Sequence, residues 1–239
     1  MTDQPPADSS KPVNPVRNRP IRSFVLRTGR MTAAQSDALE QHWLNHGLEM
    51  QDGEIDCLRV FGQVAPLTVE IGFGMGDSLL EMARVDPQRN FIGIEVHTPG
   101  VGRLLAGIDE LELTNLKVYR ADAVQVLNNC LPDNSIDCVQ VFFPDPWHKK
   151  RHHKRRLIQP TFLSLLEKKL QVGGRLHIAT DWQHYAEKTM QLLEESPAWA
   201  NTREPNSYVP RPESRPKTKF ERRGEKLGHG VWDMIFKRE

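Results

Sequence analysis

The chain has 239 residues, of which 38% are hydrophobic and 26% are charged. This composition is typical of a globular protein and excludes a fibrous, collagen-like or wholly disordered chain. The length fits one or two domains, and one domain is the simplest expectation. The 32 lysines and arginines almost balance the 31 aspartates and glutamates, so the net charge of +1 gives no indication of a nucleic-acid partner.

The cysteines and the apolar runs indicate in which cellular compartment the protein is expected. Cys57, Cys130 and Cys138 are odd in number and form no C-x-x-C pair, which excludes a disulfide framework and a four-cysteine zinc site. No apolar run approaches the ~18 residues of a membrane-spanning helix, and the chain begins without the apolar centre of a signal peptide. We therefore expect a cytoplasmic protein that has no contact with membranes.

The amino-terminal region divides into two segments. Residues 1–20 contain five prolines and almost no large apolar side chain, which predicts a disordered tail. Residues 21–31 combine Arg22, Arg27 and Arg30 with apolar neighbours. We expect this basic segment to begin a single domain that spans residues 21–239.

A helix is predicted over residues 33–46. Thr32 and Gln35 fit a capping box at its start, and Gly47 is a natural stop. His42 and His46 stand one turn apart on it, but no third ligand is evident. A solvated helix face is therefore favoured over a metal pair.

From residue 66 onward, short apolar runs alternate with helical periodicity, which is typical of βαβ units around a parallel sheet. The predicted strands cover 67–71, 90–96, 116–119, 136–143 and 175–179. The predicted helices cover 77–84, 99–111, 123–129, 157–170 and 182–195. The run 231–236, with a partner near 208–220, is expected to add antiparallel edge strands. The predicted fold class is α/β, a doubly wound Rossmann-like sheet that is mostly parallel with an antiparallel edge strand at the carboxyl terminus.

The first of these strands runs into a glycine-rich loop, Glu70-Ile-Gly72-Phe-Gly74-Met-Gly76-Asp77. Glycines allow a tight turn and let a ligand approach the main chain. The loop fits neither the dinucleotide fingerprint, which needs a glycine where Asp77 stands, nor the P-loop. Glu70 and Asp77 would repel a pyrophosphate and favour a cationic ligand, such as S-adenosylmethionine.

Two further carboxylates follow the next two strands. Glu95 stands 19 positions after Gly76, near the ~20 expected of an acid that binds ribose hydroxyls. Asp122 is placed to receive the exocyclic amine of an adenine. Ligands of such sheets bind outside the carboxyl ends of the strands, so these acids and Glu70 predict one cofactor crevice. Each acid alone is equally well explained as a helix N-cap.

The fourth strand ends in Phe142-Phe-Pro-Asp145-Pro-Trp147-His-Lys149. The two prolines fix the backbone around Asp145, which places a carboxylate for a base edge beside a ring for stacking. A rigid loop around a buried tryptophan is the structural alternative.

Positive charge gathers directly after that loop. Six of the eight residues from Lys149 to Arg156 are lysine or arginine. Such a run is usually a solvated face, but phosphate contacts at this place would attract and orient a polyanion. Asp181 ends the fifth strand on the same rim, and residues 203–226 hold eight Lys/Arg against four Glu, as expected of a loop that folds over a substrate. The histidines of the run belong to this surface, and no metal site is expected.

Together these motifs resemble those of the bacterial tRNA (guanine-N7-)-methyltransferase family, TrmB, over roughly residues 21–238. The string from Phe142 to Lys149 is the most specific. The other matching motifs are Arg22-Ser-Phe-Val, Glu70 to Gly76, Gly93-Ile-Glu-Val-His97 with Pro99-Gly-Val-Gly102, Ala179-Thr-Asp-Trp182, Arg215-Pro-Lys-Thr-Lys-Phe-Glu221 and Gly228-His-Gly-Val-Trp232. Residues 1–20 do not match.

The resemblance implies methyl transfer from S-adenosylmethionine to N7 of guanine 46 in the variable loop of tRNA, with Asp145 as the catalytic residue. The implied cofactor-binding residues are Glu70, Gly72, Gly74, Glu95, Asp122 and Asp145. The implied substrate-binding residues are Lys149, Asp181, Thr218, Lys219, Phe220 and Glu221, and the RNA-contacting residues are Arg151, His152, His153, Lys154, Arg155 and Arg156. The sequence marks no large apolar patch, so we expect a monomer.

The chemistry agrees with this interpretation, because N7 of guanine carries a lone pair and no proton. Its attack on a sulfonium methyl needs no general base, and the site contributes positioning and electrostatics. Two alternatives remain. The Pro-Asp145-Pro-Trp147 loop is similar to loops of amino-methyltransferases that act on adenine or cytosine, and a non-catalytic RNA-binding protein could use the same scaffold.

Overall fold

The computed structural model describes residues 22–24, 29–218, 221 and 230–239. The predicted tail 1–20 lies outside the described residues, as do 25–28 of the basic segment and the substrate-binding candidates Lys219 and Phe220. No helix in the described part of the chain is long and apolar enough to cross a membrane.

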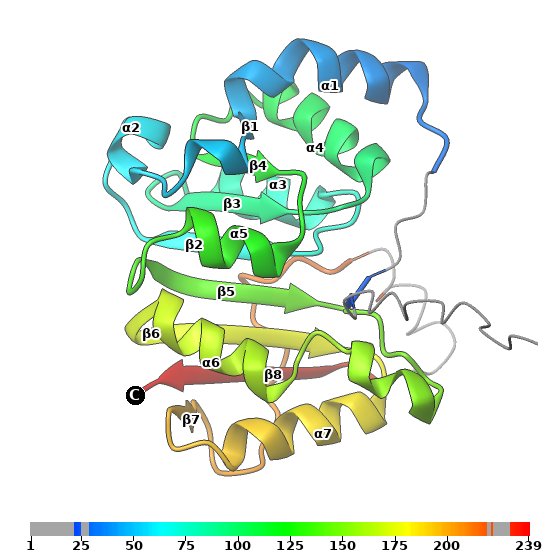
Figure 1. Ribbon diagram of the computed structural model, residues 1–239, viewed down its shortest axis with the longest axis vertical. Coiled ribbons are helices and arrows are strands. Elements are labelled where there is room, and N and C mark those ends of the chain that lie inside the picture. Colours follow the sequence, from blue (N-terminus) through cyan, green and yellow to red (C-terminus); the bar gives the residue numbers. More distant parts are fainter. Residues whose placement is uncertain (1–21, 25–28, 219–220, 222–229) are drawn as a thin grey trace, which may run out of the picture.

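The core of the molecule is an eight-stranded sheet with the order β1-β4-β3-β2-β5-β6-β8-β7 (Figure 1). The strands from β1 to β6 pair in parallel, and β8 runs antiparallel to β6 and β7. The bounds are β1 Gly47–Leu48, β2 Leu67–Ile71, β3 Asn90–Ile94, β4 Leu116–Tyr119, β5 Ile136–Phe142, β6 Leu170–Thr180, β7 Trp199–Asn201 and β8 Trp232–Arg238. The mostly parallel sheet with an antiparallel edge is confirmed.

Helices cover both faces of this sheet, as a doubly wound fold requires. The helices are α1 Ala33–His46, α2 Cys57–Phe61, α3 Asp77–Val85, α4 Thr98–Glu110, α5 Ala123–Cys130, α6 Pro160–Lys169 and α7 Gln183–Glu194, with short 3-10 turns η1 Met50–Asp52 and η2 Lys150–Arg155. One hydrophobic cluster joins α5, α6 and α7 to the sheet, and a second joins α3 and α4 to its other face.

Helix α1 has the predicted bounds and the predicted capping box. Its expected solvated face is only partly solvated, because α1 packs on α4 and the His42 Nδ1 atom lies 3.2 Å from the Asp109 carboxylate of α4. The close approach depends on Gly102, where a Cβ atom would lie 2.4 Å from the carbonyl oxygen of Gln35.

The partner predicted for the carboxyl-terminal strand was wrong in its main part. Strand β8 pairs with β6 and β7, and within the described part of 208–220 only Val209 bridges to it, opposite Asp233. Met234 and Phe236 are buried in the sheet's core, so the apolar pattern identified the strand but not its neighbour.

The segment after β7 runs instead behind the sheet, across β5 and β6 (Figure 1). Arg215 anchors it there with a side chain that is 0% exposed. The guanidinium makes paired hydrogen bonds of 2.7–2.9 Å to Glu221 and of 2.8 Å to Asp233, and His177 of β6 pairs with Asp233 at 2.8 Å. We call Arg215, Glu221, Asp233 and His177 the buried ion cluster.

Candidate active site

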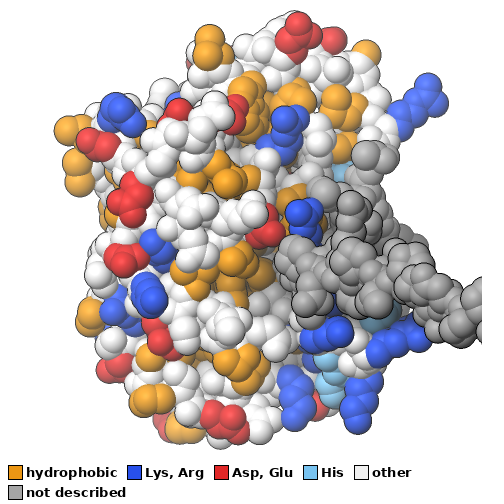
Figure 2. All heavy atoms as spheres, viewed as in Figure 1, with side chains coloured by type: hydrophobic (Ala, Val, Ile, Leu, Met, Phe, Trp, Pro, Cys, Tyr) orange, Lys and Arg blue, Asp and Glu red, His pale blue; other side chains and the backbone are white. Residues whose placement is uncertain are grey.

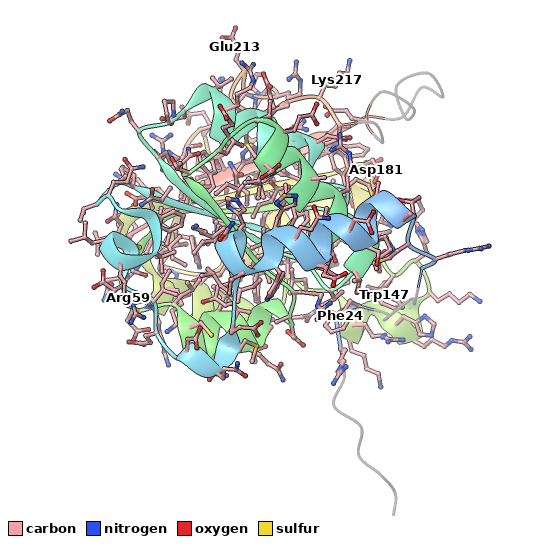
Figure 3. All side chains as sticks on the ribbon, turned by 90° about the horizontal axis from the view of Figure 1, so that it is seen from above. Phe24, Arg59, Trp147, Asp181, Glu213 and Lys217 are labelled. Carbon is pink, nitrogen blue, oxygen red and sulfur yellow. The ribbon has the colours of Figure 1, made fainter. Side chains whose placement is uncertain are left out.

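The carboxyl ends of the parallel strands meet at one edge of the sheet, on the right in Figure 1. Figure 3 shows Phe24, Trp147, Asp181 and Lys217 gathered at this end of the molecule and Arg59 at the opposite end. Ligands of parallel α/β sheets bind at this edge, so the structure places the sequence-predicted residues where a site is expected.

The glycine-rich loop after β2 turns through three left-handed residues. Gly72, Gly74 and Gly76 have φ angles of 77°, 60° and 81°, which residues with a Cβ atom rarely adopt. Helix α4 approaches closely, since a Cβ on Gly100 would lie 1.9 Å from the carbonyl oxygen of Gly74. The predicted tight turn is therefore required by both its dihedral angles and its packing.

Glu95 braces this loop. Its Oε2 atom accepts a hydrogen bond from the Gly74 amide at 3.0 Å, and its Oε1 atom accepts from the amides of Val96 and His97 at 2.7 and 2.9 Å. The carboxylate thus holds the glycine loop against the end of β3. Its predicted contact with a ribose stays a prediction.

Glu70 is a buried acid with an unsatisfied oxygen. Its side chain is on the fourth residue of β2, the residue is 3% exposed, and Oε2 has no hydrogen-bond partner among the described residues. Burial, with a smaller contribution from the nearby Glu95 carboxylate, raises the pKa of Glu70 to about 8. A cationic ligand beside it would supply the missing partner, so the residue fits the ammonium of S-adenosylmethionine.

The raised pKa makes Glu70 a source of pH-dependent stability. Between its ordinary pKa of about 4.5 and about 8, the folded chain keeps a proton that the unfolded chain releases, so stability falls as pH rises through this window. We expect Glu70→Gln to remove this dependence. Relative to the wild type, the ligand-free variant should gain at least about 1.4 kcal/mol between pH 6 and 8.5, the equivalent of one pKa unit. Urea denaturation at both pH values measures it, and parallel curves for the two proteins would contradict it.

Asp122 caps helix α5. Its Oδ1 atom accepts a hydrogen bond from the Val124 amide at 2.9 Å, which is the N-cap role that the sequence left open. The neighbouring Ala121 and Ala123 line the smaller of the two cavities at this edge, and Asp122 itself lines a groove beside it. A contact of its second oxygen with an adenine is untested.

Two cavities meet at the glycine loop and the loop after β5. The smaller, of about 230 Å³, lies beside Glu95 and Ala123 on the α5 side of the sheet. The larger, of about 560 Å³, contains Glu70 and the whole glycine loop and extends to Asp181 and Lys217. Both are lined by Gly72 and by Phe142, Phe143, Pro144 and Asp145, so Asp145 borders both.

The loop after β5 is held in a strained conformation. Phe143 and Trp147 have φ angles of 51° and 46°, in a region that bulky residues avoid at a cost of about 1–3 kcal/mol each. The Phe143 amide donates to the carbonyl of Ala179 at 2.8 Å, and the Arg155 guanidinium lies 4.2 Å from the centre of the Trp147 ring. These contacts fix the loop while Asp145 is exposed and makes no hydrogen bond with any described residue.

The amino-terminal segment forms part of this site. The Trp147 ring nitrogen donates to the carbonyl of Ser23 at 3.1 Å, and Arg155 donates to the carbonyl of Arg22. Ser23 and Phe24 line the smaller cavity. The apolar residues of this basic segment were not predicted to belong to the site.

The basic run divides into exposed and buried members. Lys149, Lys150, Arg151 and Lys154 are exposed, and His152, His153 and Arg155 are half-buried. Figure 2 shows blue and pale blue side chains gathered at this end of the molecule. Arg156 is not on the expected surface, because it is 5% exposed and donates to the carbonyl of Pro146 at 2.8 Å. A charge run in the sequence gives no sign of which guanidinium turns inward.

The predicted substrate-binding residues lie in different surroundings. Asp181 is exposed in the larger cavity, and Thr218 lines the same cavity. Glu221 is buried in the ion cluster and forms a reciprocal pair with Thr218, each accepting from the other's amide, at 3.1 and 3.3 Å. Lys217 also lines the larger cavity, although the sequence analysis did not assign it a role.

Comparisons with known proteins agree with this arrangement. A family model described as "Putative methyltransferase" matches residues 64–234. Among solved structures, the 16S rRNA methyltransferase KamB is 14% identical with a TM-score of 0.55, covering 76% of this chain and 91% of its own. The aminoglycoside resistance methyltransferase NpmB1 is 15% identical with a TM-score of 0.54, covering 80% and 94%. The fold and the site thus define a Rossmann-like methyltransferase.

Curated relatives identify the family of methyltransferases to which the chain belongs. A tRNA (guanine-N(7)-)-methyltransferase of Idiomarina loihiensis is 57% identical over 92% of this chain and 89% of its own length. The enzyme of the same name from Stutzerimonas stutzeri is 55% identical over 100% of this chain and 99% of its own. The chain belongs to the tRNA (guanine-N7-)-methyltransferase family.

Proposed function

We propose that this enzyme transfers the methyl group of S-adenosylmethionine to N7 of guanine 46 in the variable loop of tRNA. The observation that carries the proposal is the exposed carboxylate of Asp145, which has no hydrogen-bond partner among the described residues and lies where two cavities meet, next to an exposed basic surface. We place this reaction in the cytoplasm, away from membranes, and assign it to a monomer.

The residues that would hold the cofactor surround both cavities. Glu95 and Asp122 face the nucleoside, and Glu70 with Gly72 and Gly74 faces the amino-acid part. When bound, S-adenosylmethionine supplies a methyl group on a positively charged sulfur. Support comes from the buried Oε2 atom of Glu70, which no described residue bonds and which borders a cavity with room for a cation.

The remaining side chains would orient the guanine. Its N7 atom needs no base, so the protein's task is to hold the lone pair in line with the methyl group. We assign Asp145 to the donor edge of guanine, where its charge offsets the positive charge that arises on the methylated base. Lys149, Asp181 and Thr218, with Lys219, Phe220 and Glu221, are assigned to the substrate, directly or through the loop that carries them.

The reaction itself is tested by incubating the protein with labelled cofactor and unmodified tRNA. Digestion to nucleosides and mass spectrometry should locate the label in 7-methylguanosine at position 46. A label on an exocyclic amine of adenine or cytosine would establish an amino-methyltransferase instead. No label, together with no calorimetric binding of S-adenosylhomocysteine, would establish a non-catalytic RNA-binding protein.

The exposed part of the basic run should carry much of the tRNA affinity. We expect replacement of Lys150, Arg151 and Lys154 by Ala to weaken tRNA binding because phosphate contacts are lost. The slope of log K against log salt should flatten by ~0.7 for each contact with a single strand. Filter binding between 50 and 200 mM salt measures it.

Arg59→Ala is the control for this prediction. Arg59 is exposed at the far end of the molecule (Figure 3), so its loss changes the net charge without touching the proposed interface. Equal affinities and slopes for the triple variant and the wild type would show that the run is only a solvated face.

A further inference from the structure

Helices α5 and α6 lie on the same face of the sheet (Figure 1), and a groove runs along that face. Its volume is about 630 Å³, and it is bordered by α5, by α6 and by the end of the basic run. The sequence analysis gave no role to the exposed sides of α5 and α6, and the proposed reaction does not use them.

The groove continues from the candidate active site. Ser23 and Leu157 line both the groove and the 230 Å³ cavity. Asp122 lines the groove, and its chain neighbours Ala121 and Ala123 line the cavity. A chain that leaves the active site on this side therefore enters the groove. Thr161 and Lys168 of α6 both line the groove and are seven positions apart, which is a length of about 10 Å along the helix.

The charge of the groove favours an anion at both of its ends. Arg22, Lys154 and Arg155 stand at the end near the site, and Lys168 stands at the far end. Asp122 is the only acid among the described residues that line it, and one of its oxygens is already bonded to the Val124 amide.

The exposed side chains between these cations are mostly neutral and polar, and the apolar lining residues Leu157, Phe162 and Leu165 are partly or fully buried. Gln125 and Ser164 are exposed and can donate hydrogen bonds to phosphate or sugar oxygens. Val124 is the one large hydrophobic side chain of this wall that is substantially exposed, at 37%. An amphipathic helix needs a row of apolar contacts, which these residues do not offer, whereas a sugar-phosphate backbone needs cations and donors.

We propose that this groove, named the α5–α6 groove, binds the sugar-phosphate backbone of the nucleotides that adjoin the target guanine. The proposal rests on the proposed function and adds a second RNA contact surface, on the opposite side of the active site from Asp181 and Lys217. Lys168 is the groove's distal phosphate contact, and Gln125 and Ser164 bind between it and the site.

Charge reversal at the distal end tests this binding. Lys168→Glu should weaken the binding of unmodified tRNA at least tenfold and flatten its salt slope by at least ~0.7. The affinity for S-adenosylhomocysteine should not change. The matched control is Lys188→Glu, which makes the same charge change at an exposed position of α7 outside the groove. Equal tRNA affinities for the two variants would overturn the proposal.

A photo-crosslink gives an independent readout. A benzophenone amino acid at Ser164 should crosslink to tRNA, and the crosslinked nucleotides should lie next to the methylated guanine in the sequence. The same group at Lys188 should give no such product. Crosslinks only to remote nucleotides, or none from Ser164, would contradict the assignment. If the wild type methylates guanine N7 while both tests fail, only the groove is wrong; if it neither binds nor methylates tRNA, the proposed function fails with it.

Discussion

Replacement of Arg215 by Met is expected to destabilise the folded chain by about 3–5 kcal/mol, because it would leave two buried carboxylates without their cation. Arg215 is 0% exposed at its side chain and bonds both Glu221 and Asp233. Burial alone would raise the pKa of Asp233, but hydrogen bonds from His177 and Arg215 hold it below its usual range. Those carboxylates would have to protonate or reach water once the guanidinium is gone.

The same change should reduce methyl transfer even at a temperature where the variant stays folded. The Arg215 guanidinium lies 5.6 and 5.7 Å from the ring centres of Phe142 and Phe143, which precede Asp145. Glu221, its partner, holds Thr218, which also lines the larger cavity. Loss of Arg215 therefore loosens the loop after β5 and the segment that carries Thr218 at the same time.

Arg211→Met is the matched control for this prediction. Arg211 also approaches Glu221, at 3.9 Å, but its side chain is 40% exposed, and such pairs contribute at most about 1 kcal/mol. Chemical denaturation compares the two variants. Arg215→Lys, which keeps the charge but not the paired geometry, should fall between them. A loss below about 1 kcal/mol for Arg215→Met would show that the buried ion cluster does not hold the fold.

The second large effect is expected for Asp145→Asn, which should lower kcat by about 100- to 1000-fold, the usual result of removing one electrostatic contact to the transition state. Asn has the shape of Asp but lacks its charge, and its amide nitrogen would face the N–H groups of the guanine donor edge. Because Asp145 is exposed and has no hydrogen bond with the described residues, the unfolding midpoint should not change.

Single-turnover kinetics with saturating cofactor and tRNA measure this loss without interference from product release. Asp37→Asn, an exposed acid on α1 far along the chain, removes the same charge outside the site and should keep the wild-type rate. An unchanged rate for Asp145→Asn would contradict the catalytic role of the Asp145 charge and would leave positioning of the guanine by the loop as the explanation of catalysis.

Much of the fold could be predicted from local patterns. Strands β2 and β4 and helix α1 have the predicted bounds, because apolar runs and a capping box are encoded within a few residues. Strands β1 and β7 have two and three residues, too few for any periodicity. Strand β6 begins at Leu170, five residues before the predicted strand 175–179 and at the last residue of the predicted helix 157–170.

The acids of the candidate site could be predicted from the sequence, but the side chains that hold its loops in place could not. Glu70 lies near the end of β2, Glu95 directly follows β3 and Asp145 stands three residues after β5, so their common edge follows from the parallel sheet. The role of Arg215 depends on Asp233, which reaches it from β8, and no local pattern pairs the two. The inward turn of Arg156 likewise depends on Pro146 and His184, which the chain brings back to it.

The contact of Ser23 with Trp147 joins residues 124 positions apart, so the first described residues of the chain complete a site whose other walls are made much later. During synthesis the hydrogen bonds of Trp147 to Ser23 and of Arg155 to Arg22 form only after the later loop has emerged. The carboxyl terminus ends at the opposite edge of the sheet, marked C in Figure 1. An affinity tag or fusion partner at the carboxyl terminus therefore leaves the site undisturbed, whereas one joined close to Arg22 pulls directly on the wall that Ser23 and Phe24 provide.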